Sequence, residues 1–155
     1  LSYTTASEEV GTGSISGTIT DYGTADVTVE LWTEGATAAS YSVTASNGTY
    51  SIENVKPGTY TLKASKTKHV TRTYIVTIGE NNLAHNVTIY LKGDVTLDGK
   101  VNVADTARIY AHVRGVNVIA DPYVLSLGEV TGEGKVNIAD VARIYSHVRG
   151  TNPLW

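Results

Sequence analysis

The chain contains the same 23-residue segment twice. Residues 93–115 read GDVTLDGKVNVADTARIYAHVRG and residues 128–150 read GEVTGEGKVNIADVARIYSHVRG, so the copies begin 35 residues apart and agree at 17 of 23 positions. The shared positions are mostly charged, glycine and surface-type residues, which a repeated apolar core would not require. The duplication therefore constrains the fold and the function of this chain more than any other feature.

Each copy begins with a loop whose oxygen-bearing residues follow the ligand spacing of an EF-hand calcium loop. Counting from Asp94, oxygen side chains stand at positions 1, 3, 5, 9 and 12, and glycine stands at position 6. Alternate side chains can surround one ion, the glycine permits a sharp bend, and the backbone carbonyl of position 7 adds an oxygen. The predicted calcium ligands are Asp94, Thr96, Asp98, Lys100, Asn102 and Asp105 in the first loop, and Glu129, Thr131, Glu133, Lys135, Asn137 and Asp140 in the second loop.

An acidic turn before a helix is the simpler alternative for these loops, and it explains Asp105 as a helix cap. It does not explain why the whole spacing occurs twice. The second loop departs further from the pattern, because Glu129 and Glu133 each carry an extra methylene. Threonine at position 3 of both loops is also a poorer ligand than aspartate or asparagine. We therefore predict calcium in the first loop and leave the second loop open between filled and empty.

A helix of about a dozen residues is predicted after each loop. Ile109 and Val113, repeated as Ile144 and Val148, lie four positions apart and are predicted to face the core. The opposite stripe is typical of a protein-binding surface, and its duplicated tyrosine, arginine and histidine identities favour that interpretation over a domain that buries both faces. The predicted partner-binding residues are Val103, Ala104, Ala107, Arg108, Tyr110, Ala111, Arg114, Ile138, Ala139, Ala142, Arg143, Tyr145, Ser146 and Arg149.

Paired loops that lack the first helix of an EF-hand and are joined by a short linker resemble dockerin modules, over residues 93–155. This resemblance implies binding to a cohesin domain of a scaffold protein, as in the secreted cellulosomes that degrade plant polysaccharides. It implies contacts from the helix positions that include Val103, Ala104, Ile138 and Ala139. It also implies a bacterial protein that is secreted, extracellular or associated with the cell surface.

The first half of the chain alternates apolar and polar side chains with a period of two. Seven short runs, spaced by about ten residues, predict an all-β antiparallel sandwich of about seven strands. We therefore predict two domains: a β-sandwich over residues 1–92, and a small all-α domain of duplicated calcium loop–helix units over residues 93–155, with its repeats at 93–115 and 128–150. The runs include Ile15 to Ile19, Val27 to Leu31, Tyr41 to Ala45, Tyr50 to Ile52, Tyr60 to Ala64, Tyr74 to Ile78 and Val87 to Leu91.

The stretches GSISGTITD, NGTYSIENVKPGTYTLKAS and HNVTIYL resemble carboxypeptidase regulatory-like and Cna B-type sandwiches. Such a sandwich beside a dockerin-like module is similar to an X-module–dockerin pair, which implies that the sandwich braces its neighbour. An aromatic platform of Trp32 with Tyr22, Tyr41 and Tyr90 would instead suggest carbohydrate binding. The simpler alternative is that most of these tyrosines are half-buried sheet residues.

The composition argues against several other functions. A formal net charge of −3 argues against nucleic acid and anionic membranes as partners, and the absence of cysteine rules out disulfides and thiol catalysis. No catalytic set of nucleophile, base and acid is recognisable, so we expect a non-catalytic monomer. The alternatives are a structural calcium module without a cohesin partner and a β domain that binds carbohydrate. The terminal Trp155 is predicted to pack onto the start of the second domain or onto the sandwich.

Overall fold

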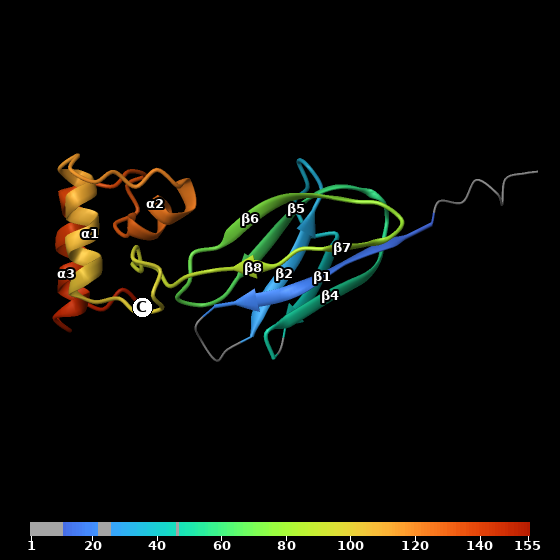
Figure 1. The fold of residues 1–155 in the computed structure, drawn as a ribbon, viewed down its shortest axis with the longest axis horizontal. Coiled ribbons are helices and arrows are strands. Elements are labelled where there is room, and N and C mark those ends of the chain that lie inside the picture. Colours follow the sequence, from blue (N-terminus) through green and yellow to red (C-terminus); the bar gives the residue numbers. More distant parts are fainter. Residues whose placement is uncertain (1–10, 22–25, 46) are drawn as a thin grey trace, which may run out of the picture. The chain divides into compact units, whose positions relative to one another are not determined.

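A computed structural model of the chain describes residues 11–21, 26–45 and 47–155. Those residues form a β-sandwich of two sheets followed by a region of three helices (Figure 1), which confirms the predicted fold class. They divide into two compact units, and the helical unit contains Lys66–Val70 as well as Ile89–Trp155. The elements are β1 (Gly13–Thr20), β2 (Val27–Trp32), β3 (Tyr41–Ala45), β4 (Thr49–Val55), β5 (Gly58–Ser65), β6 (Arg72–Ile78), β7 (Asn82–Ala84), β8 (Val87–Thr88), α1 (Val103–Val113), α2 (Pro122–Gly128) and α3 (Ile138–Val148).

The strand unit consists of two sheets packed face to face. In one sheet β1 lies between β4 and β7 and also pairs with β8, and in the other the strand order is β3-β2-β5-β6. Burial alternates along the longer strands because each strand turns its apolar side chains toward the other sheet. The seven predicted runs coincide with β1 to β6 and β8. Side chains that are fully buried in this core include Ile15, Val29, Leu31, Val55, Leu62, Ile78 and Val87.

The sandwich is not wholly antiparallel, in contrast to the prediction. Strand β1 pairs antiparallel with β4 but parallel with β7 and β8. Two glycines on β1 permit this close approach: a Cβ added to Gly13 would lie 2.1 Å from the carbonyl oxygen of Gly79, and one added to Gly17 would lie 2.1 Å from that of His85. Alternation of side chains reports burial and not strand direction, so the sequence pattern did not indicate the parallel pairs.

Replacing Gly17 by alanine is therefore expected to destabilise the sandwich by about 2 kcal/mol or more, because the new methyl group collides with backbone that cannot move alone. Gly79→Ala is the matched control, since a Cβ at Gly79 meets no atom within 4 Å. Urea unfolding followed by tryptophan fluorescence measures both variants, each made in a Trp155→Phe background in which Trp32 is the remaining tryptophan. Equal stability of the two variants would contradict the close packing of β1.

One histidine in the sandwich is poised to respond to pH. In the part of the chain that the structure describes, Nε2 of His85 is buried and has no hydrogen-bond partner. The imidazole ring of His85 stands edge-on to the ring of Tyr74, with centroids 4.6 Å apart. The guanidinium of Arg72 lies over the Tyr74 ring, 5.2 Å from its centroid. Burial lowers the pKa of His85, because the protonated ring would carry a buried charge.

A histidine with a lowered pKa favours the folded state only while it is neutral. The sandwich is therefore expected to keep its full stability above the ordinary histidine pKa of about 6.5 and to lose stability as the pH falls below it. His85→Phe, which keeps an aromatic ring beside Tyr74, is expected to reduce this loss. The measurement is the urea midpoint at pH 7 and at pH 5 for both proteins. An identical acid-induced loss in the variant would exclude His85 as its source.

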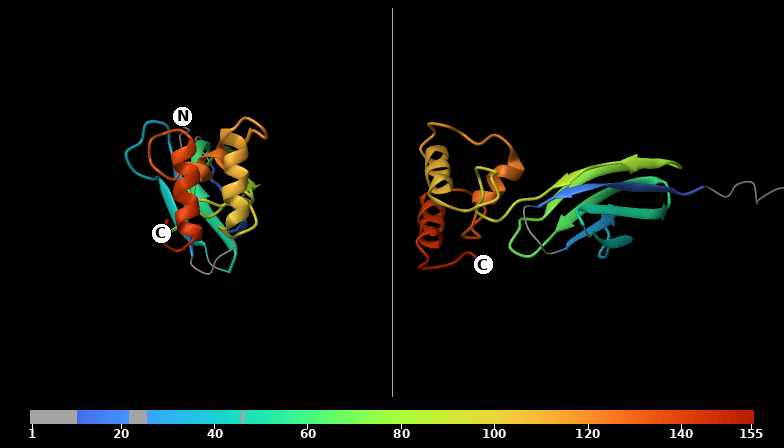
Figure 2. Two further views of the ribbon diagram at one scale, coloured as in Figure 1. Left: turned by 90° about the vertical axis from the view of Figure 1, so that its left-hand side faces the viewer. Right: turned by 60° about the horizontal axis from the view of Figure 1, so that its bottom comes forward.

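The helical unit has its own apolar core. Helices α1 and α3 lie alongside each other (Figure 2), and each turns an isoleucine inward, Ile109 and Ile144, both fully buried. Val101 and Val136, at position 8 of the two loops, are half-buried and pack against this core. None of the helices in the described part of the chain has the length and apolar character needed to cross a bilayer. The buried core residues of the unit are Val95, Ile109, Ile119, Leu127, Val130 and Ile144.

The segment between the copies is not a plain linker but contains helix α2. Asp121 caps this helix by accepting hydrogen bonds from the backbone N–H groups of Tyr123 (2.8 Å) and Val124 (3.3 Å), and Pro122 occupies its first turn. These are ordinary signals of a helix start. The hydroxyl of Tyr123 donates to the carbonyl of Val70 (2.8 Å) and accepts from the N–H of Tyr90 (3.1 Å), so α2 also holds other segments of this unit together.

The duplicated histidines bind the backbone that follows their own helices. Nδ1 of His112 accepts a hydrogen bond from the N–H of Ile119 (2.9 Å), and Nδ1 of His147 accepts one from the N–H of Leu154 (2.9 Å). Burial, together with the charge of Arg143, lowers the pKa of His147 and so favours the neutral ring that can accept this bond. Each of these hydrogen bonds thus holds the segment after the helix against the core, because Ile119 is buried in the core and Leu154 packs against it.

Two duplicated arginines act in the same way. The guanidinium of Arg108 donates to the carbonyl of Asn117 (2.6 Å), and that of Arg143 donates to the carbonyls of Asn152 and Pro153. The repetition of these arginines and of the histidines therefore has a structural cause and does not by itself require a binding surface. A role of Arg108 and Arg143 in partner binding stays a prediction.

The C-terminal residues pack differently from the prediction. Leu154, not Trp155, reaches the start of the unit: a Cβ at Gly93 would lie 2.8 Å from its Cδ1 atom. Trp155 instead packs against His147, with ring centroids 4.5 Å apart and ring planes inclined by 45°, and remains 38% exposed. The smaller aliphatic side chain fits the narrow space beside Gly93, and the indole covers the ring at the end of α3.

Candidate metal centre

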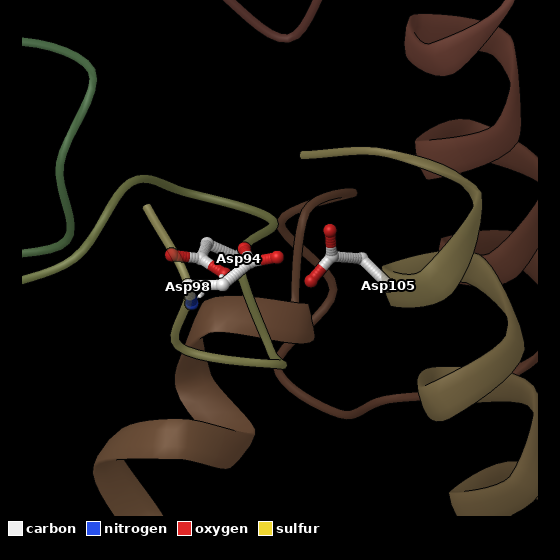
Figure 3. Close-up of side chains that lie close together, drawn as sticks. All are labelled: Asp94, Asp98 and Asp105. Carbon is white, nitrogen blue, oxygen red and sulfur yellow. Dashed lines mark hydrogen bonds between the residues drawn. The ribbon is translucent and has the colours of Figure 1, made fainter. Parts of the chain in front are cut away.

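Three carboxylates of the first loop gather at the start of α1. One carboxylate oxygen from each of Asp94, Asp98 and Asp105 lies within 4.8 Å of the other two. Among the described residues, no other group of three potential metal-ligating side chains is as close together. Figure 3 shows Asp105 pointing from the first turn of α1 toward Asp94 and Asp98 in the loop. Asp94 and Asp105 are fully buried and Asp98 is exposed, so the group lies at the edge of the core.

Backbone N–H groups fix the two buried carboxylates. Asp94 accepts hydrogen bonds from the N–H groups of Asp98 (3.2 Å) and Gly99 (2.8 Å). Asp105 accepts from the N–H groups of Thr96 (3.0 Å) and Asn102 (2.8 Å), and from the Thr96 hydroxyl (2.9 Å). Asp105 therefore joins the loop to the helix, because Asn102 is the residue that caps α1. The alternative role of Asp105 as a helix cap and its predicted role as a loop ligand are both compatible with this position.

The charge of this group is not compensated by cationic side chains. Among the described residues, the salt bridge is between Lys66 and Asp21, and neither of these residues belongs to the carboxylate group. Burial raises the pKa of Asp94, and the charges of Asp105 and Asp98 raise it further against the effect of the backbone hydrogen bonds. The hydrogen bond from the N–H of Lys100 lowers the pKa of Asp98. A bound cation would relieve the repulsion that acts on Asp94.

The donor set fits a hard divalent cation. It consists of carboxylate and hydroxyl oxygens, and calcium takes six to eight oxygen ligands whereas softer metals favour nitrogen or sulfur. The first loop supplies three carboxylates that are already close together and in part held by backbone hydrogen bonds. Asp94, Asp98 and Asp105 would hold calcium in the first loop, and Thr96 lies next to them. The function of Lys100 and Asn102 as ligands stays a prediction.

The second loop is arranged around a hydroxyl group. The Thr131 hydroxyl lies 3.3 Å from an oxygen of Glu129, 3.1 Å from one of Glu133 and 3.1 Å from one of Asp140. It has one proton and can donate to one of these three acceptors. Asp140 repeats the part played by Asp105, because it accepts from the N–H groups of Thr131 (3.1 Å) and Asn137 (2.8 Å).

The longer side chain at position 1 changes the bonding of the second loop. Glu129 accepts a hydrogen bond from the N–H of Gly132 at position 4 (2.8 Å), whereas Asp94 accepts from positions 5 and 6 of its own loop. Position 4 has a positive φ in both loops, 65° at Leu97 and 84° at Gly132. The sequence marks position 6 by its glycine in both loops, but it does not mark position 4 as left-handed, because a leucine occupies that position in the first loop.

Converting the second loop toward the first is expected to strengthen its affinity for calcium. In Glu129→Asp/Glu133→Asp the shorter side chains restore the first loop's acidic residues, and we expect the dissociation constant of the weaker site to fall by tenfold or more. Calorimetric titration of metal-free protein measures both sites. Asp94→Glu is the reciprocal control and is expected to weaken the first site. An unchanged weaker site would show that side-chain length is not what limits it.

The stripe predicted to bind a partner is exposed to solvent on both helices. Val103 and Ile138, at the starts of α1 and α3, are 63% and 59% exposed. Tyr110 and Tyr145 are also exposed, and each lies beneath an arginine guanidinium 5.6 Å from its ring centroid. A helical unit that buried both faces is therefore excluded. We refer to this set as the docking stripe. Its exposed members are Val103, Ala104, Ala107, Tyr110, Arg114, Ile138, Ala139, Ala142, Tyr145 and Arg149, and its half-buried members are Ala111 and Ser146.

The three described members of the aromatic platform considered for carbohydrate do not share the outer face of one sandwich sheet. Tyr41 packs edge-on to Tyr60 in the sandwich, with centroids 5.9 Å apart, and its hydroxyl accepts from the N–H of Lys56. Tyr90 belongs to the helical unit. Tyr22 lies outside the described residues. Of the three described aromatic residues, Trp32 lies on the outer face of a sandwich sheet, and Tyr41 is the half-buried sheet residue that the simpler alternative predicts.

Comparison with known proteins agrees with the strand unit described above. Residues 14–92, 79 of the 155 residues, match the carboxypeptidase regulatory-like domain. The chain belongs to the carboxypeptidase regulatory-like domain family. The match covers the eight described strands of this carboxypeptidase regulatory-like domain except for the first residue of β1, and it stops just before the loop that begins at Asp94. No curated protein matches the sequence.

Two solved structures align with most of the chain. Both are mutant type II cohesin–X-dockerin complexes from Acetivibrio cellulolyticus, one altered at the C-terminal interface and one at the N-terminal interface. Their sequence identities to this chain are 22% and 23%, and the TM-score is 0.43 in both cases. Each alignment covers 87% of this chain and 94% of the other.

Proposed function

We propose that the helical unit is a non-catalytic, calcium-dependent docking module that binds a cohesin domain and so tethers its parent protein to a scaffold. The observation that carries this proposal is the docking stripe, which is duplicated in sequence and exposed on both helices. Its large apolar residues cannot be explained by the fold, because the core of the unit is built from the opposite face of the same helices. Exposed apolar groups of this kind mark interaction surfaces.

Calcium supports docking by fixing the starts of the two helices. Position 9 of each loop is the residue that caps the helix, and position 12 is the third helical residue, whose carboxylate returns to the backbone N–H of the cap. The stripe begins directly between these two positions. Ligation of Asp105 would therefore hold Val103 and Ala104 in place without touching them, and Asp140 stands in the same relation to Ile138 and Ala139.

The same proposal assigns a location outside the cell, at the cell surface or in a secreted complex. Calcium modules that work there need dissociation constants of only about 10⁻⁴ to 10⁻³ M, which leaves room for a weak second loop. The chain would act as a monomer that binds one cohesin. The near-identity of the two stripes lets the partner approach either copy, as in a surface with approximate two-fold symmetry.

Titration against a panel of cohesins, with calcium and again with excess chelator, tests the proposal. Tight binding to one member that disappears with chelator supports it and identifies the partner class. A chain that calcium stabilises against heat but that binds no cohesin would favour the alternative, a structural calcium module without this partner. If calcium changes neither cohesin binding nor thermal stability, the assignment of the two loops as calcium sites is wrong.

A further inference from the structure

The outer face of one sandwich sheet carries a hollow that the docking function does not use. It has a volume of about 540 Å³ and lies over β2, β5 and β6, beside the loop that follows β2. This volume is within the usual range of small-molecule sites, about 300 to 1,000 Å³. The side chains that define the hollow are Trp32, Thr59, Thr61, Lys63 and Ile75, and residues 33–36 close one side.

Strand register brings the apolar members of the hollow into one row. Trp32 pairs with Thr61, and Thr61 pairs with Ile75, so an indole, a hydroxyl and an aliphatic side chain cross three adjacent strands. Ile75 is 74% exposed, the highest value among the large apolar residues of the described chain. The next row is a pair of hydroxyls, Thr59 and Thr77, whose oxygens are 3.2 Å apart. The surface therefore places apolar groups directly beside hydroxyl groups.

The indole of Trp32 is held in one orientation. Its Nε1 donates a hydrogen bond to Glu30 (3.0 Å), two residues earlier on β2, and the ammonium of Lys63 lies 3.9 Å from the ring centroid. The hydrogen bond to Glu30 reduces the freedom of the ring before any ligand arrives, which lowers the entropic cost of binding. Lys63 can exchange its contact with the ring for a hydrogen bond to a ligand, because its long side chain is flexible.

The chemistry of the hollow selects a neutral ligand that is apolar on one side and rich in hydroxyls on another. One ammonium group, that of Lys63, is accompanied by two carboxylates, those of Glu30 and Glu34, so the surface disfavours an anionic ligand. A pyranose ring combines a face of C–H groups, which stacks on an indole or an isoleucine, with an edge of hydroxyls that pair with threonine, lysine and glutamate. From this combination we propose that the hollow beside Trp32 binds a neutral oligosaccharide segment.

The test uses the full chain, and the two tryptophans provide a matched pair. Trp32→Ala removes the stacking surface, whereas Trp155→Phe changes the tryptophan that packs against His147 in the other unit. Electrophoresis through gels that contain soluble xylan, hydroxyethylcellulose or galactomannan measures binding as retardation, and polygalacturonate provides an anionic comparison. Thermal unfolding verifies that each variant is folded.

We expect at least one of the three neutral polysaccharides to retard the wild-type chain and Trp155→Phe, and Trp32→Ala to lose at least nine-tenths of that retardation. In Trp155→Phe, where Trp32 is the remaining tryptophan, the same polysaccharide should shift the indole emission. Normal mobility in all three neutral gels overturns the proposal. It is equally overturned if Trp32→Ala is retarded as strongly as wild type or if only polygalacturonate retards the chain. Cohesin binding is expected to be the same in both variants, so the two functions are tested separately.

Discussion

Replacing Asp105 by asparagine is expected to weaken calcium binding by the first loop strongly and to destabilise the helical unit even without calcium. Both carboxylate oxygens of Asp105 accept backbone hydrogen bonds, from Thr96 and Asn102, in a fully buried position. The amide of asparagine offers one acceptor in place of two, so one buried N–H loses its partner at a cost of about 1 to 3 kcal/mol. The loss of one of three carboxylates is expected to weaken calcium binding at least a hundredfold.

Asp98→Asn separates these two effects. Asp98 is a member of the same carboxylate group but is exposed, so its replacement is expected to weaken calcium binding and to leave the metal-free unit almost unchanged in stability. The free energy of unfolding is measured with calcium at a hundred times the wild-type dissociation constant, and again with excess chelator. The wild-type unit should gain about 2.7 kcal/mol from calcium, and neither variant should gain as much. A full calcium-dependent gain in Asp105→Asn would mean that Asp105 is not a ligand.

The clustering of three first-loop carboxylates could be predicted because it depends on local spacing alone. A loop that surrounds one ion fixes which positions point inward, and Asp94, Asp98 and Asp105 stand at three of them. The second loop has the same spacing, but spacing does not show what the extra methylene of Glu129 does. Its carboxylate reaches the N–H of Gly132, a detail of side-chain length that only the structure provides.

Roles that depend on backbone partners were not predictable in the same way. The duplicated His112 and Arg108 bind the N–H of Ile119 and the carbonyl of Asn117, and any residue offers such groups. A repeated identity therefore told us that these side chains matter and not what they contact. The parallel pairing of β1 with β7 escaped for a related reason, since backbone pairing leaves no mark on the pattern of side chains.

Charged substitutions at the starts of helices α1 and α3 are expected to have a large effect on the affinity for the cohesin. Val103→Asp and Ile138→Asp each place a charge in the docking stripe at a residue that is 63% or 59% exposed, so neither change should affect folding. If the partner can use either copy, each single variant keeps one intact stripe and binds within a few-fold of wild type. The double variant has no intact stripe, and we expect its affinity for the cohesin to fall by a hundredfold or more, about 2.7 kcal/mol.

Titration of the cohesin identified in the panel, in the presence of calcium, measures the three variants. Ile75→Asp is the matched control, because Ile75 is equally apolar and 74% exposed but lies on the sandwich. A hundredfold loss in one single variant and none in the other would mean that the partner uses one copy only. Full affinity in the double variant would show that docking does not occur through the stripe. The pattern of losses thus decides whether the duplication supplies two equivalent surfaces or one surface and a structural copy of it.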